Sequence, residues 1–397
     1  MPSDSKPSPE KRRVAFCGTR GLPANYGGFE TAVDEITRRL VTKGYACDVF
    51  CRLSHSSAIV PEHEGRRLIY VRGAHNPRLE TFLSAFQTGW YLLRHRKEYD
   101  HVFWFNNANF PGILLTLLSG IPFTVNTDGL EWRRKKWTWP FKAYYFAVSL
   151  LLSHIAPRLI SDSKAIQAYY QKRFGRRSFL IPYGVPGSPS VSEEEAKRIL
   201  QQYGLEKEKY FLQITRFEPD NLPLEIAQAF IASRLHEKGF HYVAVGFQKA
   251  NRYALRLKAL SGKGGVKVLP ATYDPRLLTT LRTHCFAYVH GNSVGGTNPA
   301  LLEALVTAPR VLAIDVPFTR EVLGEAGIYF TLATLPQTLI KALQSPPRRE
   351  TLLQRASWYN WDAVAQCYEA IINDQIPSYS PSPNYLDNRR PTLVVDP

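Results

Sequence analysis

The sequence predicts two α/β domains, each built on a doubly wound parallel sheet, that face each other across one cleft. Short apolar runs alternate with helical stretches over most of the 397 residues, which is the pattern of parallel strands joined by crossover helices. This length is enough for two domains, each with its own core. A segment dense in proline and glycine, 182–190, separates two similar series of elements.

The first series opens with a buried strand at 13–18, a turn at 19–28 and an amphipathic helix at about 29–43. Further strands are expected at 46–51, 68–72, 101–105, 123–126, 159–161 and 179–182. In the second series they are expected at 211–215, 242–245, 266–269, 286–290, 311–314 and 328–330. A final helix at 361–372 places Val364, Tyr368, Ile371 and Ile372 on one face.

These elements predict the division of the chain. We expect a disordered N-terminus (1–11), a first domain (12–185), a second domain (186–360), a C-terminal helix (361–376) and a disordered tail (377–397). The tail is rich in proline and serine, a composition that cannot bury enough apolar surface to order itself.

Composition and cysteine usage indicate a globular protein of a reducing compartment. The chain is 44% hydrophobic and 12% aromatic, and its five cysteines stand apart, mostly within apolar runs. We expect no signal peptide, because residues 1–10 lack an apolar core, and no membrane span, because no apolar run reaches the necessary length. The predicted location is therefore cytoplasmic.

The positive charge is concentrated in the first half of the chain. The net charge is +16 overall, and residues 1–180 hold 27 Lys and Arg against 14 Asp and Glu, a net charge of +13. Such an excess favours an anionic partner: a nucleic acid, a phospholipid surface or a phosphorylated substrate.

The polar residues that directly follow apolar strands predict where the cleft lies. In doubly wound sheets ligands bind at the carboxyl ends of the strands. The cleft should therefore be lined by 18–28, 127–131, 161–163, 215–221, Gly246 and 291–298.

The most informative segment is 290–305, where a strand, a small-residue turn and a helix start follow one another. Backbone N–H groups of a first helical turn have no partner within the helix, and the helix dipole there favours an anion. We expect a phosphate on this turn and Glu303 on a sugar or ribose hydroxyl. The alternative is a plain helix start, capped by Thr297 or Asn298 with Pro299 as first residue. The predicted donor-binding residues here are Ser293, Gly295, Gly296, Thr297, Asn298 and Glu303.

Two other strand-end turns contribute to the same predicted site. Gly27 and Gly28 would let a ligand approach the start of the first helix, although the turn is not the glycine pattern of a dinucleotide site. Arg216 follows the first strand of the second domain, with Asn221 close behind. An arginine there is suited to a diphosphate, and the alternative is an ion pair with Glu218 or Asp220.

Three carboxylates at strand ends, Asp128, Glu131 and Asp162, are candidates for holding an acceptor hydroxyl or acting as a base. For Asp162 a helix cap is equally consistent. Beside them lies a run of four basic residues among tryptophans. Its members, Arg133, Arg134, Lys135 and Lys136, suit lipid headgroups or an acceptor phosphate, or else form a solvated loop anchored by the tryptophans.

Together the segments 18–31, 128–137, 216–221 and 293–305 resemble the GT-B glycosyltransferases of family 4. The similarity is greatest to a branch of bacterial surface-polysaccharide transferases, many described as rhamnosyltransferases. The resemblance implies two Rossmann-like domains, with the acceptor on the first and a nucleoside-diphosphate sugar on the second. It also implies transfer without a metal or other cofactor, usually with retention of configuration, and a last helix that crosses back to the first domain.

The chain departs from the wider family at two positions. Gly295 stands where that family has the first of two glutamates, and Leu222 stands where it has a lysine. We therefore expect other groups to hold the donor sugar and Arg20 to supply a second positive charge.

The predicted function is transfer of a sugar, with rhamnose as the candidate, to a glycan or lipid-pyrophosphate acceptor on the inner face of the cell membrane. The alternatives are a nucleotide-sugar epimerase or phosphorylase on the same fold, or a basic nucleic-acid-binding protein. The last lacks a recognisable binding motif, so we expect no nucleic-acid partner.

Overall fold

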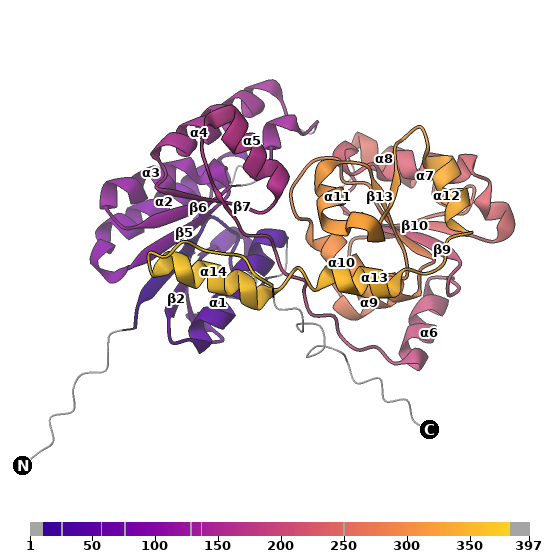
Figure 1. The fold of residues 1–397 in the computed structure, drawn as a ribbon, viewed down its shortest axis with the longest axis horizontal. Coiled ribbons are helices and arrows are strands. Elements are labelled where there is room, and N and C mark those ends of the chain that lie inside the picture. The colour runs from indigo at the N-terminus through magenta and orange to yellow at the C-terminus, as the bar shows by residue number, and fades with distance from the viewer. Residues whose placement is uncertain are drawn as a thin grey trace, which may run out of the picture.

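The structure is a computed structural model in which two α/β domains lie side by side (Figure 1). It describes residues 11–24, 27–56, 58–74, 77–127, 129–135, 137–248 and 251–381. Each domain has one sheet between layers of helices, so the predicted fold class is confirmed.

The sheet of the first domain has the strand order β3-β4-β2-β1-β5-β6-β7-β8, and its described pairs are parallel except β3 with β4. Its strands are β1 (Arg13–Cys17), β2 (Ala46–Arg52), β3 (Glu62–His63), β4 (Arg66–Val71), β5 (His101–Phe105), β6 (Phe123–Asn126), β7 (Arg158–Ser161) and β8 (Phe179–Leu180). The sequence does not predict β3, because a polar two-residue edge strand has no apolar run to reveal it.

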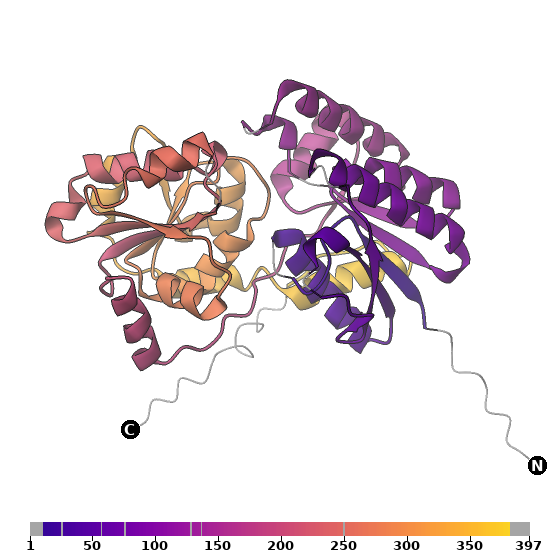
Figure 2. The ribbon, with the colours of Figure 1, turned by 180° about the vertical axis from the view of Figure 1, so that it is seen from behind.

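Helices cover both faces of this sheet. They are α1 (Gly28–Thr42), α2 (Pro77–Arg94), α3 (Phe110–Ser119), α4 (Trp139–Ile155) and α5 (Lys164–Phe174). The last four lie on one face, while α1 lies on the other beside the C-terminal helix α14 (Trp361–Ile372), as Figures 1 and 2 show.

The sheet of the second domain is wholly parallel, in the order β11-β10-β9-β12-β13-β14. Its strands are β9 (Tyr210–Ile214), β10 (His241–Phe247), β11 (Val266–Pro270), β12 (Ala287–His290), β13 (Val311–Ile314) and β14 (Ile328–Phe330). Its helices are α6 (Glu193–Gln202), α7 (Pro223–Ala232), α8 (Arg252–Lys258), α9 (Pro275–His284), α10 (Pro299–Thr307), α11 (Pro317–Leu323), α12 (Leu335–Ala342) and α13 (Arg349–Ala356).

Helix α14 follows the second domain in the chain but packs on the first. Tyr368 is buried against Phe103, with ring centroids 4.7 Å apart, and its hydroxyl accepts a hydrogen bond of 3.1 Å from Asn126 Nδ2. Just beyond the helix, Asp374 pairs with Arg158 at 2.7 Å. These contacts tie the end of the chain to the first domain.

The described part of the tail does not match the prediction of disorder from residue 377. The Tyr379 hydroxyl accepts from the N–H of Asn360 at 3.0 Å and donates to the carbonyl of Trp358. The tail therefore lies against the turn between α13 and α14 at least this far; its remainder, like residues 1–10, falls outside the described residues. Within the described ranges, no helix has both the length and the apolar character to cross a bilayer.

Each sheet reverses its winding direction at one point. The reversal lies between β1 and β5 in the first sheet and between β9 and β12 in the second. In doubly wound sheets the crevice at the carboxyl ends of such a strand pair is where ligands bind. The loops after β9 and β12, 215–221 and 291–298, are therefore the expected binding loops of the second domain.

Candidate functional site

The turn after β12 leads into α10 in the way the sequence predicts. Asn298 caps the helix, its side-chain oxygen accepting from the N–H of Ala300 at 3.0 Å, and Pro299 is the first helical residue. Gly295 has φ of 151°, a value that favours glycine. The predicted helix cap is therefore present. The positive end of the helix dipole still points at the turn before α10, where it would favour an anion.

The loop after β9 is joined to this turn through Asp220. The carbonyl of Asp220 accepts from both the N–H and the Oγ of Ser293, at 2.8 and 2.9 Å. Asn221 is buried, and its Nδ2 donates to the carbonyl of Arg216 at 2.8 Å. The side chains of Ser293 and Asn221 thus shape the two loops, and their predicted contacts with the donor stay predictions.

Arg216 stands at the edge of the same loop with its side chain in solvent. It is exposed, and its guanidinium pairs with no residue that the structure describes. The alternative of an ion pair with Glu218 or Asp220 is therefore wrong. An exposed guanidinium on a loop that is hydrogen-bonded to the turn before α10 is suited to a diphosphate.

Glu303, in the second turn of α10, forms an ion pair with Arg282 on α9. The Arg282 side chain is 5% exposed, and that of Glu303 is 30% exposed. The carboxylate therefore has a structural partner that the sequence analysis did not find, because the two residues belong to different helices. Its partial exposure leaves part of the group accessible from solvent.

The loops of the first domain meet these loops of the second closely. A Cβ on Gly28 would lie 2.9 Å from the ring of Pro299, and one on Gly129 would lie 3.3 Å from Gly295 Cα. The N–H of Lys135 donates to both carboxylate oxygens of Asp220, each at 3.0 Å. The predicted cleft residues therefore belong to one site between the domains.

Asp162 lies at the centre of this contact. Its carbonyl accepts from Thr297 Oγ1 at 2.5 Å, and a Cβ on Gly296 would lie 2.0 Å from its carboxylate. Only glycine allows so close an approach, which explains that residue at position 296. Asp162 is 7% exposed and does not cap α5, whose N-cap is Ser163. The cap alternative for Asp162 is wrong.

The other two candidate carboxylates differ from Asp162. Glu131 is buried, its Oε1 pairs with Arg134, and its Oε2 accepts from the indole N–H of Trp137 at 2.7 Å. With both oxygens engaged, Glu131 anchors its own loop in this structure, and its role in holding an acceptor hydroxyl or acting as a base stays a prediction. Asp128 lies outside the described residues.

The basic run is not the uniform headgroup surface that its sequence indicates. Arg133 is exposed and stacks over the ring of Tyr169 at 5.0 Å, while Arg134 is held by Glu131. The side chain of Lys135 is exposed, and Lys136 lies outside the described residues. Trp132 packs among aromatic rings and Trp137 stacks on Phe141, so only Trp139 of the three tryptophans is exposed.

The first glycine turn is closed by Glu30, whose carboxylate accepts from the N–H of Arg20 at 2.9 Å. Gly27 has φ of 106°, which favours glycine, and a Cβ there would meet the same carboxylate at 2.9 Å. Gly27 and Gly28 are therefore needed by the turn and by its contact with Pro299. This supplies a structural reason for both residues beside the predicted role in binding the donor.

His290 ends β12 immediately before the predicted phosphate turn. It is buried, its Nε2 has no hydrogen-bond partner among the described residues, and burial lowers its pKa to about 3. The ring is therefore neutral at physiological pH. A neutral, buried imidazole contributes no positive charge to the site, so Arg216 and the α10 start must supply it.

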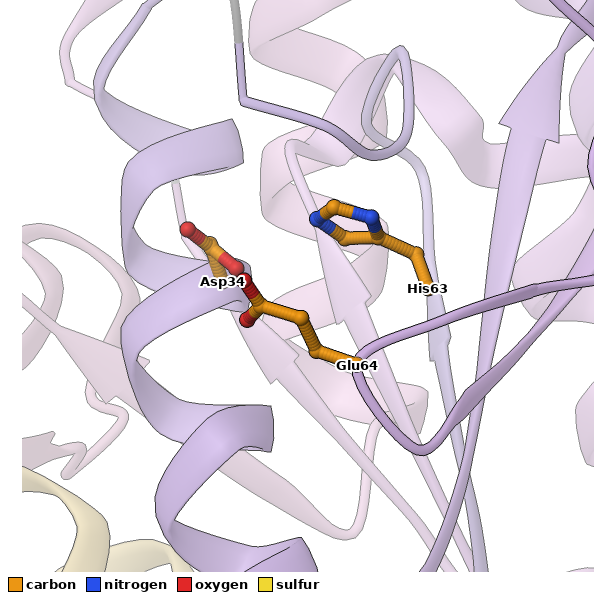
Figure 3. Close-up of side chains that lie close together, drawn as sticks. All are labelled: Asp34, His63 and Glu64. Atoms are coloured by element: carbon orange, nitrogen blue, oxygen red, sulfur yellow. The ribbon is translucent and has the colours of Figure 1, made fainter.

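One group of side chains in the described ranges has the spacing of metal ligands, and it lies elsewhere. Asp34 on α1 and His63 and Glu64 at the β3 edge have ligand atoms within 4.8 Å of one another (Figure 3). Arg66 pairs with Asp34 at 2.6 Å and with Glu64 at 2.7 Å, and Arg38 pairs with both carboxylates as well. The arginines already neutralise the carboxylates, so this group is an ion-pair network at the sheet edge.

Comparison with known proteins identifies the class. Residues 26–187 match Glycosyltransferase Family 4. The fold is similar to that of sucrose-phosphate synthase from Thermosynechococcus elongatus, with 15% identity, a TM-score of 0.76, and coverage of 92% of this chain and 99% of that chain. It is also similar to the trehalose-6-phosphate structure from E. coli bound with UDP-2-fluoro glucose (9% identity, TM-score 0.68, coverage 93% and 100%). A glycosyltransferase from Rickettsia africae gives 13% identity, a TM-score of 0.67 and coverage of 92% and 98%.

No curated protein is detectably similar to this chain. The domain match and the fold nevertheless agree: residues 26–187 form a family 4 glycosyltransferase domain, and the whole chain has the GT-B architecture. The protein is a glycosyltransferase of the GT-B type.

Proposed function

We propose that the protein transfers a sugar from a nucleoside-diphosphate sugar held by the loops after β9 and β12. The observation that carries this proposal is the position of Arg216, which pairs with no described residue. It lies on a loop that is hydrogen-bonded, through Asp220 and Ser293, to the turn before α10. An arginine and a helix start at a switch point supply fixed positive charge and N–H dipoles to a departing diphosphate.

The chemistry needs little from a protein base. As the bond to the anomeric carbon breaks, negative charge develops on the leaving phosphate, and Arg216 with the N–H groups of 296–298 would stabilise it. Asp162, at the contact between the two domains, is the carboxylate that we propose orients an acceptor hydroxyl. With retention, the leaving phosphate itself can take the acceptor proton. A trehalose-6-phosphate synthase whose structure bears on glycosyltransfer with retention has a similar fold, which supports retention here.

The donor and acceptor are proposed more finely from the sequence resemblance. We propose a hexose-type donor, with rhamnose as first candidate, and an acceptor in bacterial surface-polysaccharide synthesis that is a glycan or a lipid pyrophosphate. Leu222 has an uncharged hydrocarbon side chain and is buried, so this position brings no charge to the diphosphate. Arg20, in the turn that contacts the α10 start through Gly28 and Pro299, is the proposed second cation.

The test is an assay of the purified chain with a panel of nucleoside-diphosphate sugars, with and without an acceptor extract. We expect release of nucleoside diphosphate that depends on acceptor, together with a product carrying the sugar. Conversion of the donor to an isomer without acceptor would instead establish the epimerase alternative. Release of nucleotide from no member of the panel would contradict the proposal.

A further inference from the structure

The outer faces of α2, α3 and α4 are unusually apolar for a globular protein. Large apolar side chains stand exposed on all three neighbouring helices, which lie on one face of the first sheet (Figure 1). They are Leu79, Phe82, Leu83, Phe86 and Trp90 on α2, Leu114, Leu117 and Leu118 on α3, and Trp139, Tyr144, Leu150 and Leu151 on α4. We call this set the apolar face. Patches of this extent on a monomer mark interaction surfaces.

The buried faces of α2 and α3 are unusual as well. On α2 the buried positions include Ser84, Ala85 and Thr88, and on α3 they include Gly112 and Thr116. Globular helices place leucine and aromatic residues inward and small polar ones outward. On α2 and α3 much of the buried face is small instead, with Leu92 and Ile113 as the large exceptions, while phenylalanine, leucine and tryptophan face outward. Helix α4 buries large residues in the usual way and exposes others beside them.

The inward polar groups of α2 and α3 are satisfied within the protein, so this arrangement is stable. Thr88 Oγ1 donates to the carbonyl of Ser84 at 2.9 Å, and Thr116 Oγ1 donates to that of Gly112 at 2.9 Å while accepting from the indole of Trp104 at 3.0 Å. The backbones of α2 and α3 approach closely, because a Cβ on Gly89 would lie 2.7 Å from the carbonyl oxygen of Gly112. Close packing through small residues lets the two helices pack without their large side chains, which remain on the outer surface.

The charged residues around the apolar face indicate what it contacts. From residue 132 to 192 the chain has 11 Lys and Arg and one carboxylate, the buried Asp162. Lys172, Arg173 and Arg177 are exposed on or just beyond α5, which neighbours α4, and at the far side Arg94 lies over the Trp90 ring at 5.0 Å. The nearby carboxylate of Glu98 is paired with His95. An apolar face with exposed tryptophans and basic flanks fits the interface of an anionic bilayer.

We propose that the apolar face of α2, α3 and α4 inserts into the headgroup and upper acyl region of an anionic lipid bilayer. This rests on the lipid-pyrophosphate acceptor of the proposed function for its role and does not depend on the donor chemistry. The basic loop ending at Lys135 reaches Asp220 of the second domain, and α4 begins at Trp139. A bilayer on this face would therefore border the site between the domains, where a lipid-linked acceptor must enter.

The test compares two triple variants of the full chain. The face variant carries Phe82→Ser, Leu118→Ser and Leu151→Ser, whose residues are 51%, 66% and 44% exposed. The control variant carries Leu255→Ser, Leu332→Ser and Ile340→Ser on the second domain, which are 52%, 48% and 42% exposed. Because all six side chains point into solvent, both variants should unfold at the temperature of the native chain.

Vesicles of phosphatidylcholine with phosphatidylglycerol are the probe. We expect the native chain and the control variant to co-sediment with them, and the face variant to remain in the supernatant. Trp90 and Trp139 are unchanged in both variants, so brominated acyl chains should quench fluorescence of the native chain and not of the face variant. Equal binding by the two variants would overturn the proposal. It would also be overturned by a native dimer that the face variant abolishes, without vesicle binding, since that would assign the face to a second protein copy.

Protection by nucleotide sugars against thermal unfolding separates the two proposals. The face variant should retain whatever protection the native chain shows, because its substitutions lie on the outer faces of helices. Absence of protection in every protein would count against the proposed function and leave the membrane result standing.

Discussion

The ion pair between Glu303 and Arg282 allows the proposed ribose contact to be tested against a structural role. Replacing Glu303 by glutamine removes the charge that compensates Arg282, whose side chain is only 5% exposed. Breaking a buried pair by removing one partner costs about 3–5 kcal/mol, and the 30% exposure of Glu303 places this case toward the lower end. The same substitution weakens a charge-assisted hydrogen bond to a ribose hydroxyl, worth about 1.5–3 kcal/mol, so the donor Kd should rise about ten- to a hundredfold.

A second substitution separates these two effects. Arg282→Met keeps an unbranched apolar stem and removes the stranded charge, so the Glu303→Gln/Arg282→Met variant should recover most of the lost free energy of unfolding. Its donor Kd should stay raised. Denaturant titration measures the first quantity and calorimetric titration with the nucleoside diphosphate measures the second. Native donor affinity in the double variant would refute the ribose contact and leave Glu303 a purely structural residue.

Three further predictions follow from the same structure. Arg216→Ala should lower kcat/KM by about two to three decades at an unchanged unfolding temperature, because the side chain is exposed and unpaired; normal steady-state turnover would show that it does not stabilise the leaving group. Activity should persist in EDTA, and loss of turnover that Mn²⁺ restores would contradict a metal-independent transfer. Burial lowers the pKa of His101 and His290 from 6.5 to about 3, so the unfolded chain binds protons that the folded one does not, and stability falls as pH drops below 6.5. At pH 5 each histidine should cost about 2 kcal/mol in denaturant titrations, a loss that His290→Asn should reduce; the same acid sensitivity in this variant would assign the effect to other groups.

The sequence predicts the sheets well because buried parallel strands must be apolar along their whole length. The runs 101–105, 123–126, 311–314 and 328–330 are strands with the predicted bounds. The loops at the strand ends follow from the same pattern, so the segments 215–221 and 291–298 could be assigned to one site. The prediction missed the edge strand Glu62–His63, because this strand is short and polar and has no apolar run.

The contacts between the two domains at the site could not be predicted from the sequence. They join residues far apart in the chain, and they use backbone N–H and carbonyl groups, which every residue type except proline has in full. The N–H of Lys135 on Asp220 is a backbone donor, and the Asp162 carbonyl that accepts from Thr297 is a backbone acceptor. Glu131 shows a contact within one loop that the sequence does not predict either. Its position after a strand indicates chemistry, but Arg134 and Trp137 of its own loop engage both oxygens.

The apolar face was missed for a different physical reason. Helical periodicity predicts that Phe82, Phe86 and Trp90 share one face of α2, but it does not tell whether that face meets the sheet or the solvent. The usual assumption places the large residues inward. Only the burial of Ser84 and Thr88 reveals that this face meets the solvent.

The central claim is that the loops after β9 and β12 bind a nucleoside-diphosphate sugar. Its most direct test is thermal unfolding of the native chain and of Arg216→Ala with a panel of uridine, thymidine and guanosine diphosphate sugars. We predict that at least one donor raises the unfolding temperature of the native chain and that Arg216→Ala abolishes this shift. A shift equally large in the variant, or none with any donor, would contradict the account.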